Sequence, residues 1–135
     1  MILVDTSAWV EFLRDTGSPA CNRVGELLRA DLATCDAIRM ELLAGARNER
    51  HWRDLGRLIA RAVLVPTQPG DFDQAAALYR QCRRRGKTVR VLVDCLIGAV
   101  AIRADLAVLH CDTDFDALAR HTPLRIDAAR RLDAR

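Results

Sequence analysis

Short, wholly apolar runs alternate with segments of helical period along this chain. Residues 2–4, 63–65 and 106–109 each hold three or four apolar residues in a row, which is typical of strands buried on both faces of a sheet. Residues 33–35 and 124–126 are weaker strand candidates. Parallel strands need long crossover connections, usually helices, and the intervening segments supply them. This order predicts an α/β fold in which helices cover both faces of a parallel sheet.

Local signals mark the ends of several expected helices. Pro19 suits the first turn of a helix, Asp36 is an expected N-cap, and Gly86 stands where a C-terminal glycine belongs. The segment 91–104 is apolar nearly all round, so we expect its helix to be buried. Helices are expected over residues 6–15, 19–30, 36–45, 48–60, 71–85, 91–104 and 114–120.

Length and composition narrow the class of protein. A chain of 135 residues suits one domain, which we expect over residues 1–126 with a short tail over 127–135. The longest uninterrupted apolar stretch, 96–102, is far short of the roughly 20 residues of a membrane span, and the N-terminus lacks the basic segment of a signal peptide. The five cysteines form an odd set without C-x-x-C spacing. They are expected to be reduced thiols of a cytoplasmic protein, with no membrane partner and no zinc site.

Three acids lie beyond the ends of expected strands. Asp5 directly follows the run 2–4, and Asp112 and Asp114 come shortly after the run 106–109. In open α/β sheets, ligand sites lie beyond the carboxyl ends of the strands. An ordinary structural explanation stays open for each of them, because an acid at such a position can cap a helix or be solvated in its first turn.

Two further acids interrupt apolar surfaces. Glu41 falls roughly 160° around its helix from the solvent-facing Arg39, and Asp94 is flanked by apolar residues on both sides. Partial exposure of Glu41 and an N-cap role for Asp94 are the alternatives. Five converging carboxylates would repel one another, and a hard divalent cation such as Mg²⁺ or Mn²⁺ removes that conflict. Acid clusters of this kind activate water for attack on phosphodiesters.

Basic residues are concentrated in one segment, although the formal net charge is only +3. Residues 80–90 contain six of them and no acid. Such a segment fits a polyanionic substrate, and a solvated helix end is the alternative. The residues expected to contact such a polyanion are Arg83, Arg84, Arg85, Lys87 and Arg90.

The chain resembles the PIN-domain VapC toxins over nearly its whole length. Four motifs occur in that family's order and spacing: Val4-Asp5-Thr6-Ser7-Ala8-Trp9, Met40-Glu41-Leu42-Leu43-Ala44-Gly45, Gly86-Lys87-Thr88-Val89 with Asp94, and Asp112-Thr113-Asp114-Phe115. The resemblance implies a PIN-like three-layer sandwich whose central sheet has five parallel strands, the first near its centre. It also implies Mg²⁺- or Mn²⁺-dependent cleavage of structured RNA such as tRNA, by the toxin of a type II toxin–antitoxin pair.

The same resemblance assigns roles to individual residues. Thr6 would add a hydroxyl to the acid cluster. Cys111 stands where the family usually has Thr or Ser, and a thiol supports the neighbouring acid less well than a hydroxyl does. The metal ligands would be Asp5, Asp94 and Asp112. The catalytic acids would be Asp5, Glu41, Asp94, Asp112 and Asp114.

Partners and mechanism follow from the same likeness. The family implies a VapB-type antitoxin that covers the acids and apolar surface around Trp9 and Phe12, and a homodimer of the free toxin. The histidines His51, His110 and His121 lie in three separate elements, so metal-activated water is expected instead of attack by the 2′-hydroxyl of the RNA. The alternative is a catalytically inactive PIN-fold module that binds RNA. Phosphatase or adhesion-type metal sites need Asp-x-Asp or Asp-x-Ser-x-Ser, and residues 5–9 match neither.

Overall fold

Four short strands form the centre of the molecule. The computed structural model describes residues 1–127, so the expected tail lies outside the described residues except for its first residue. All strand pairs are parallel, in the order β3-β2-β1-β4, which places the first strand inside the sheet. The strands are β1 (Ile2–Val4), β2 (Ala33–Cys35), β3 (Val63–Val65) and β4 (Ala107–Leu109).

The expected fifth strand at residues 124–126 is wrong for the described structure. Only a single parallel bridge forms there, between Val108 and Ile126, followed by a hydrogen bond from the Asp127 amide to the Val108 carbonyl at 2.9 Å. Over the described residues the pairing is limited to this one bridge, and the Asp127 carboxylate is bonded to the guanidinium of Arg23, 3.1 Å away.

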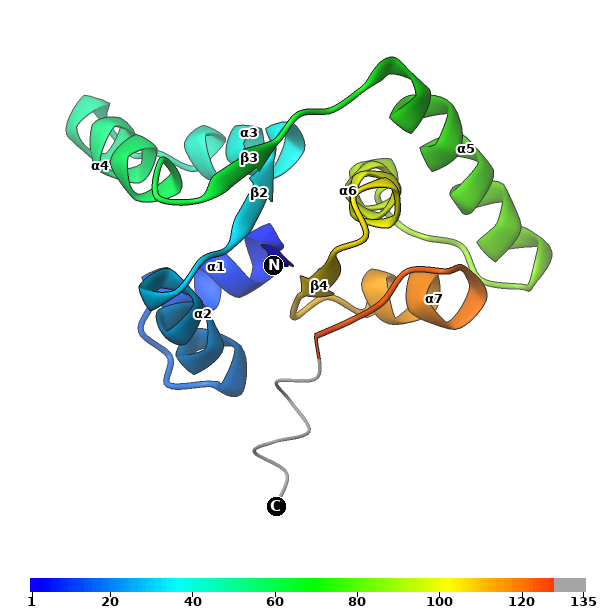
Figure 1. Ribbon diagram of the computed structural model, residues 1–135, viewed down its shortest axis with the longest axis horizontal. Coiled ribbons are helices and arrows are strands. Elements are labelled where there is room, and N and C mark those ends of the chain that lie inside the picture. The colour runs from blue at the N-terminus through cyan, green and yellow to red at the C-terminus, as the bar shows by residue number, and fades with distance from the viewer. Residues whose placement is uncertain (128–135) are drawn as a thin grey trace.

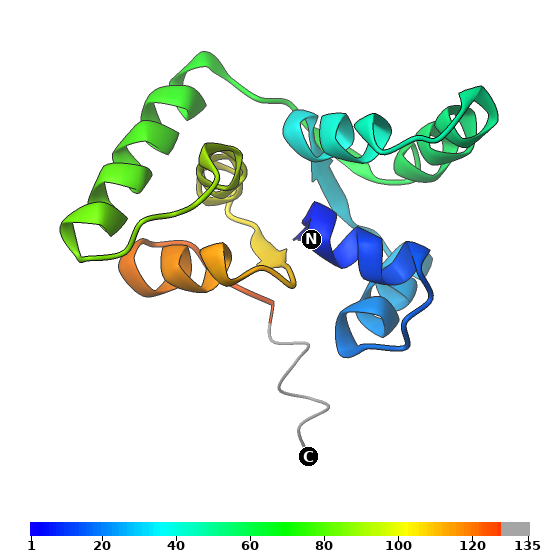
Figure 2. The same ribbon diagram turned by 180° about the vertical axis from the view of Figure 1, so that it is seen from behind.

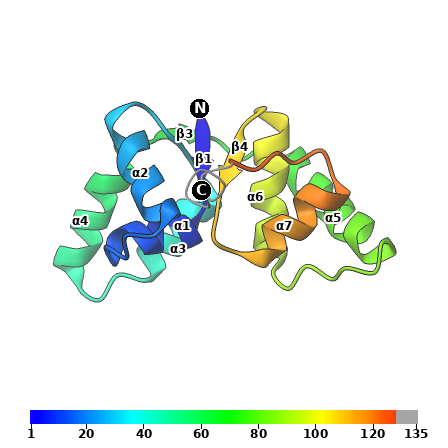
Figure 3. The same ribbon diagram turned by 90° about the horizontal axis from the view of Figure 1, so that it is seen from below.

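Seven helices cover the strands in the described part of the chain. Figure 3 shows α1, α2 and α4 on one side of the strands and α5, α6 and α7 on the other, which makes three layers. In both Figure 1 and Figure 2, α5 lies outside α6, and these two helices pack closely against each other. The helices are α1 (Thr6–Leu13), α2 (Pro19–Arg29), α3 (Asp36–Ala44), α4 (Glu49–Ile59), α5 (Pro69–Arg84), α6 (Leu92–Arg103) and α7 (Thr113–His121).

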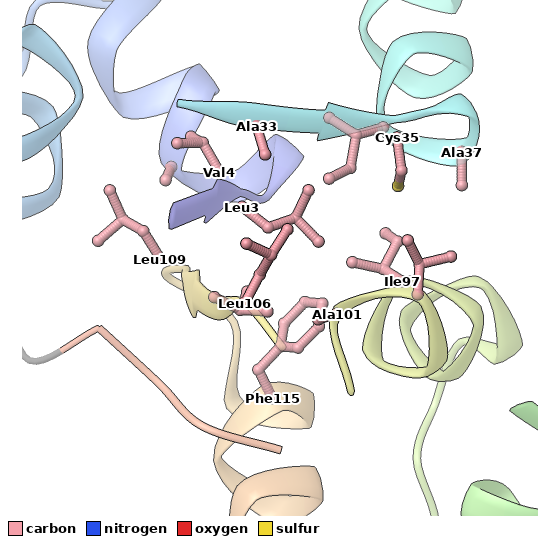
Figure 4. Packing of buried hydrophobic residues seen from close by; sticks show 14 of the residues in the cluster. Leu3, Val4, Ala33, Cys35, Ala37, Ile97, Ala101, Leu106, Leu109 and Phe115 are labelled. Carbon is pink, nitrogen blue, oxygen red and sulfur yellow. The ribbon is translucent and has the colours of Figure 1, made fainter. Parts of the chain in front are cut away.

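Aliphatic side chains fill the space between the sheet and α6. Leu3 of β1, Ile97 of α6 and Phe115 of α7 are fully buried there, and Figure 4 shows them among neighbours from β2 and β4. The prediction that the apolar helix is buried is confirmed. Trp9 is also fully buried, whereas Phe12 is only partly so. The Trp9 ring therefore belongs to the core and is not itself available to the expected antitoxin.

The run at residues 63–65 is not the buried strand that its apolar composition predicts. Val63 is 48% exposed and Leu64 is 46% exposed, because β3 is the outer strand of the sheet. No helix in the described part of the chain is long and apolar enough to cross a membrane. The five cysteines are free thiols, and four of them are buried.

Two of the three residues expected to mark helix ends do so in the structure. Gly86 adopts φ +77°, and its amide and that of Lys87 bond the last carbonyls of α5 at 3.0 and 2.9 Å, as a C-terminal glycine does. Pro19 opens α2. Asp36, expected as an N-cap, is instead the first residue of α3, and its carboxylate accepts the amide of Thr67 at 2.9 Å.

An ion pair fixes α5 against α6. Arg103 donates to both carboxylate oxygens of Asp71 at 2.8 and 3.0 Å and to the Pro66 carbonyl at 2.8 Å. The guanidinium, and to a lesser degree the amide of Gln68, hold the pKa of Asp71 below its usual range. This contact holds the helix that carries the basic segment beside the helix that carries Asp94.

Candidate active site at the carboxyl ends of the strands

Acidic side chains gather where β1 and β4 end. Asp5 follows β1 directly, and its amide bonds the Leu109 carbonyl at the end of β4, 2.9 Å away. Asp112 follows β4 three residues later, and Asp94 lies in the first turn of α6. The carboxyl ends of parallel strands meet at one edge of a sheet, which is where α/β proteins bind ligands.

Three of the predicted acids form a close group. Ligand oxygens of Asp94, Asp112 and Asp114 all lie within 4.8 Å of one another. Asp94 and Asp114 are buried and Asp112 is partly exposed. Asp5, which was expected as a direct metal ligand, is not a member of this close group of described residues. Its charge nevertheless acts on Asp94.

Asp94 is a buried acid whose pKa is strongly raised. Its N-cap alternative is wrong, because Val91 is the N-cap of α6. The Oδ2 atom is buried and has no hydrogen-bond partner. Burial, followed by the charges of Asp5 and Asp112 and the contact with Asp114, raises the pKa of Asp94 to about 8. At neutral pH the metal-free site therefore retains a proton.

Asp5 both caps α1 and faces the acid cluster. Its Oδ2 accepts the amide of Ser7 at 3.0 Å and the Ser7 hydroxyl at 2.5 Å. Burial raises the pKa of Asp5 in spite of these bonds, and the charge of Glu41 adds to the shift. Ser7 Oγ in turn accepts the Cys111 amide at 2.9 Å, so one hydroxyl ties the end of β1 to the end of β4.

Glu41 and Thr6 connect α3 to α1 beside Asp5. The Thr6 hydroxyl donates to Glu41 Oε1 at 2.8 Å. Glu41 is partly exposed, in line with its structural alternative. The carboxylate nevertheless lies close enough to Asp5 to contribute to that residue's raised pKa.

Asp112 is held by backbone contacts and by a histidine that the sequence did not single out. Its carboxylate caps α7 by accepting the Asp114 amide at 2.9 Å, and its own amide donates to His110 Nδ1 at 3.0 Å. His110 is buried, with its ring 5.3 Å from that of Phe115. The sequence led us to expect the side chain at position 111 to support Asp112. In the structure His110, the residue before Cys111, does so.

Arg90 is the member of the basic segment that reaches the acids. Its amide lies 3.2 Å from Asp114 Oδ2, Nε lies 3.4 Å from Asp114 Oδ1, and Nη2 lies 3.3 Å from Asp112 Oδ1. The guanidinium thus partly neutralises two of the three grouped carboxylates. The other expected RNA contacts are exposed on the end of α5 and the following loop: Arg83, Arg84, Arg85 and Lys87.

The donor set fits a hard divalent cation. The grouped ligand atoms are all carboxylate oxygens, the type that Mg²⁺ and Mn²⁺ prefer. An unpaired buried oxygen such as Asp94 Oδ2 costs free energy unless it is protonated or bound. A bound proton and the side chain of Arg90 neutralise the negative charge of the grouped carboxylates only in part.

The chain is an α/β domain with a candidate metal site, formed by carboxylates at the carboxyl edge of a small parallel sheet that has helices on both sides. The model of the PIN domain matches residues 2–121. The chain is 46% identical over 129 residues to ribonuclease VapC11 of Mycobacterium tuberculosis, covering 93% of this chain and 96% of that protein. The chain belongs to the PIN-domain family, within its VapC group.

Solved structures show the same fold. VapBC2 of Rickettsia felis, crystallised with a DNA fragment of its promoter, aligns with a TM-score of 0.76 at 17% identity over 94% of this chain and 98% of that one. VapC20 of Mycobacterium tuberculosis, described as a sarcin-ricin loop cleaving toxin, aligns with a TM-score of 0.63 at 22% identity over 93% and 99%. At these identities the likeness concerns the fold.

Proposed function

We propose that this protein is a Mg²⁺-dependent endoribonuclease that acts as the toxin of a type II toxin–antitoxin pair. The observation that carries the proposal is the group formed by Asp94, Asp112 and Asp114, with a buried unpaired oxygen on Asp94. The 46% identity to a protein named ribonuclease VapC11 supports the same activity.

In this proposal the chain's own side chains position the reaction. Asp94, Asp112 and Asp114 would hold the cation, with Asp5 as the further ligand expected from the sequence and Glu41 beside it. A bound Mg²⁺ supplies neutralising charge and a water of lowered pKa for attack on phosphorus. Ser7 fixes Asp5, and His110 fixes the backbone at Asp112. The exposed basic segment would hold the phosphates of the substrate.

We further propose that the substrate is structured RNA, with tRNA as the expected class. A relative of the same fold is described as cleaving the sarcin-ricin loop, a folded RNA element. The cluster lies at the carboxyl edge of the sheet, where a projecting loop of RNA would reach it without unwinding a helix.

Cleavage should require the metal and take its oxygen from water. EDTA is expected to stop cleavage of tRNA by the purified protein, and excess Mg²⁺ or Mn²⁺ should restore it. The products should carry 5′-phosphate and 3′-hydroxyl ends, and reaction in H₂¹⁸O should place one ¹⁸O on the 5′-phosphate. A 2′-deoxy sugar at the cleavage position should leave the reaction possible. A 2′,3′-cyclic phosphate end, or RNA binding with no cleavage under any divalent metal, would overturn the proposal.

We propose a VapB-type antitoxin as the protein partner and a homodimer as the state of the free toxin. Two of the fold's relatives, VapBC2 and the VapBC-1 of nontypeable Haemophilus influenzae, were solved as toxin–antitoxin assemblies. Co-expression with the small gene adjacent to this one should yield a stable complex whose cleavage rate is suppressed. Light scattering of the purified chain should give the mass of a dimer. A non-toxic monomer that ignores the adjacent gene product would contradict both proposals.

Arg90 and a divalent cation are expected to compete for the same carboxylates. Arg90→Gln should therefore raise the affinity for Mn²⁺, by about 30-fold at most, because two unit charges about 4 Å apart interact by roughly 1 kcal/mol in water and the cation carries two charges. Calorimetric titration with Mn²⁺ measures this change directly. Arg84→Gln, an exposed neighbour in the same segment, is the matched control and should leave the affinity unchanged. A weaker Mn²⁺ affinity in Arg90→Gln would show that the arginine supports the site.

A further inference from the structure

A hollow lies beside Glu41, on the side of the acid cluster away from the basic segment. It lies between α1, α3 and α4 and has a volume of about 440 Å³, within the range of small-ligand sites. Thr6 and Glu41, the hydrogen-bonded pair beside Asp5, line it as well. This α1–α3–α4 groove therefore shares Thr6 and Glu41 with the candidate active site.

The groove combines an apolar floor with a cationic rim. Val10, Leu42 and Leu55 contribute aliphatic surface, and Arg14 and Arg47 bring two positive charges. Both arginines are exposed, and neither guanidinium has a hydrogen bond or ion pair among the described residues. A ligand with one flat apolar part and one anionic part matches this combination of surfaces.

His51 adds a fixed hydrogen-bond donor to the groove. Its Nδ1 accepts the amide of Arg47 at 3.0 Å, and its own amide donates to Asn48 Oδ1, the cap of α4, at 2.8 Å. Because Nδ1 accepts a hydrogen bond, the neutral ring carries its proton on Nε2. The side chain that lines the groove thus offers an N–H group to an oxygen acceptor.

Two loops that carry basic residues lie on either side of the acid cluster. Figure 3 shows the loop from α3 to α4 and the loop from α5 to α6 at the same edge of the sheet, on opposite sides of the strands. The first carries Arg47 and the second carries Lys87 and Arg90. A polyanion whose reacting phosphate lies at the acid cluster would meet positive charge on both sides.

We infer that the α1–α3–α4 groove binds a nucleotide of the RNA substrate next to the cleaved phosphate, on the side opposite the basic segment. The base and ribose lie on the aliphatic floor, Arg14 and Arg47 bind the phosphate, and His51 Nε2 donates to an oxygen of the nucleotide. The inference rests on the proposed function for the position of the cleaved phosphate. The groove itself is independent of the metal.

The test uses a fluorescein-labelled 12-nucleotide single-stranded RNA, with Ca²⁺ in place of Mg²⁺. The Arg14→Gln/Arg47→Gln protein should bind it at least about fivefold more weakly, and the slope of log affinity against log salt should fall by about 0.7, for the one phosphate that the two arginines bind. Arg29→Gln is the matched control, since Arg29 ends α2 just before β2 and so lies at the opposite edge of the sheet. Its affinity and slope should match those of the wild type.

A crosslinking experiment distinguishes RNA from the antitoxin as the ligand of the groove. The same RNA with 4-thiouridine at each position in turn should crosslink to the segment 47–55, and the double variant should lose that crosslink while keeping those to residues 83–90. Unchanged RNA affinity together with lost binding of the co-expressed antitoxin would assign the groove to the protein partner and overturn the inference. An equal loss in Arg29→Gln would also overturn it. RNA binding in the groove without cleavage under any metal would refute the proposed function alone.

Discussion

The Asp94→Asn protein will lose Mn²⁺ binding and RNA cleavage while it keeps its fold. Asp94 contributes the buried, unpaired oxygen of the grouped acids, and an amide offers a metal only one neutral oxygen. Losing even a residue that only supports a metal ligand typically costs about 10–100-fold in affinity or activity, so removing a ligand should lower cleavage by more than about 100-fold. Cleavage of tRNA at saturating Mg²⁺ measures the change.

A matched control separates the site from the general loss of one negative charge. Asp31→Asn changes an exposed acid between α2 and β2, at the opposite edge of the sheet, and should cleave as the wild type does. Far-ultraviolet circular dichroism and thermal unfolding check that both proteins are folded. Full cleavage by folded Asp94→Asn would remove Asp94 from the active site.

The alternation of apolar runs and helical segments predicted the layers but not the position of each strand within them. Residues 63–65 are as apolar as residues 2–4, yet β3 is an edge strand with half-exposed side chains while β1 is interior. Composition reports how apolar a run is, whereas its place in the sheet depends on contacts between distant segments. The segment 124–126 likewise pairs with β4 only through the bridge at Ile126, and its composition did not indicate so short a contact.

The acids of the site could be found from the sequence because charge at an apolar position is conspicuous. Their supports were less visible. Ser7 stood in the quoted Asp5-Thr6-Ser7 run, and a serine two residues after a capping acid is a signal for the hydrogen bond that it makes. His110 lies in the strand-end segment before Asp112, but nothing in its spacing indicated that its ring would accept a backbone amide.

Arg90 shows that a sequence pattern does not predict the direction of a side chain. The sequence grouped it with the exposed basic segment, and the structure folds its side chain onto Asp112 and Asp114. The direction of a side chain in the loop between α5 and α6 follows from the electrostatic attraction of acids that come more than twenty residues later. The α1–α3–α4 groove was likewise beyond prediction, because three separate helices contribute its walls.

The metal-free protein will become less stable as the pH rises from about 5.5 to 8.5. Burial and the neighbouring acids raise the pKa of Asp94 to about 8 in the folded state, against an ordinary value of 3.8. Below the ordinary value both states bind the proton, and the unfavourable contribution of Asp94 to stability is absent. Between the two values the folded state binds more protons than the unfolded state, so stability falls as the pH rises. The fall ends once the pH has passed the folded-state pKa of about 8. The raised pKa of Asp5 acts in the same direction.

Each pH unit between the two pKa values removes up to about 1.4 kcal/mol of stability. Since 1 kcal/mol corresponds to roughly 4–8 °C for 60–100 residues and 2–4 °C for 150–250, thermal unfolding in EDTA across this range should show a fall in Tm of about 5 °C or more. Asp94→Asn should be more stable than the wild type at pH 8 and nearly independent of pH, because it cannot lose a proton there. Asp31→Asn should keep the wild-type pH dependence. Saturating Mg²⁺ should also flatten the wild-type curve, because a bound cation takes the place of the proton. A Tm of the metal-free wild type that stays constant from pH 5.5 to 8.5 would mean that the carboxylates do not share a repulsive site.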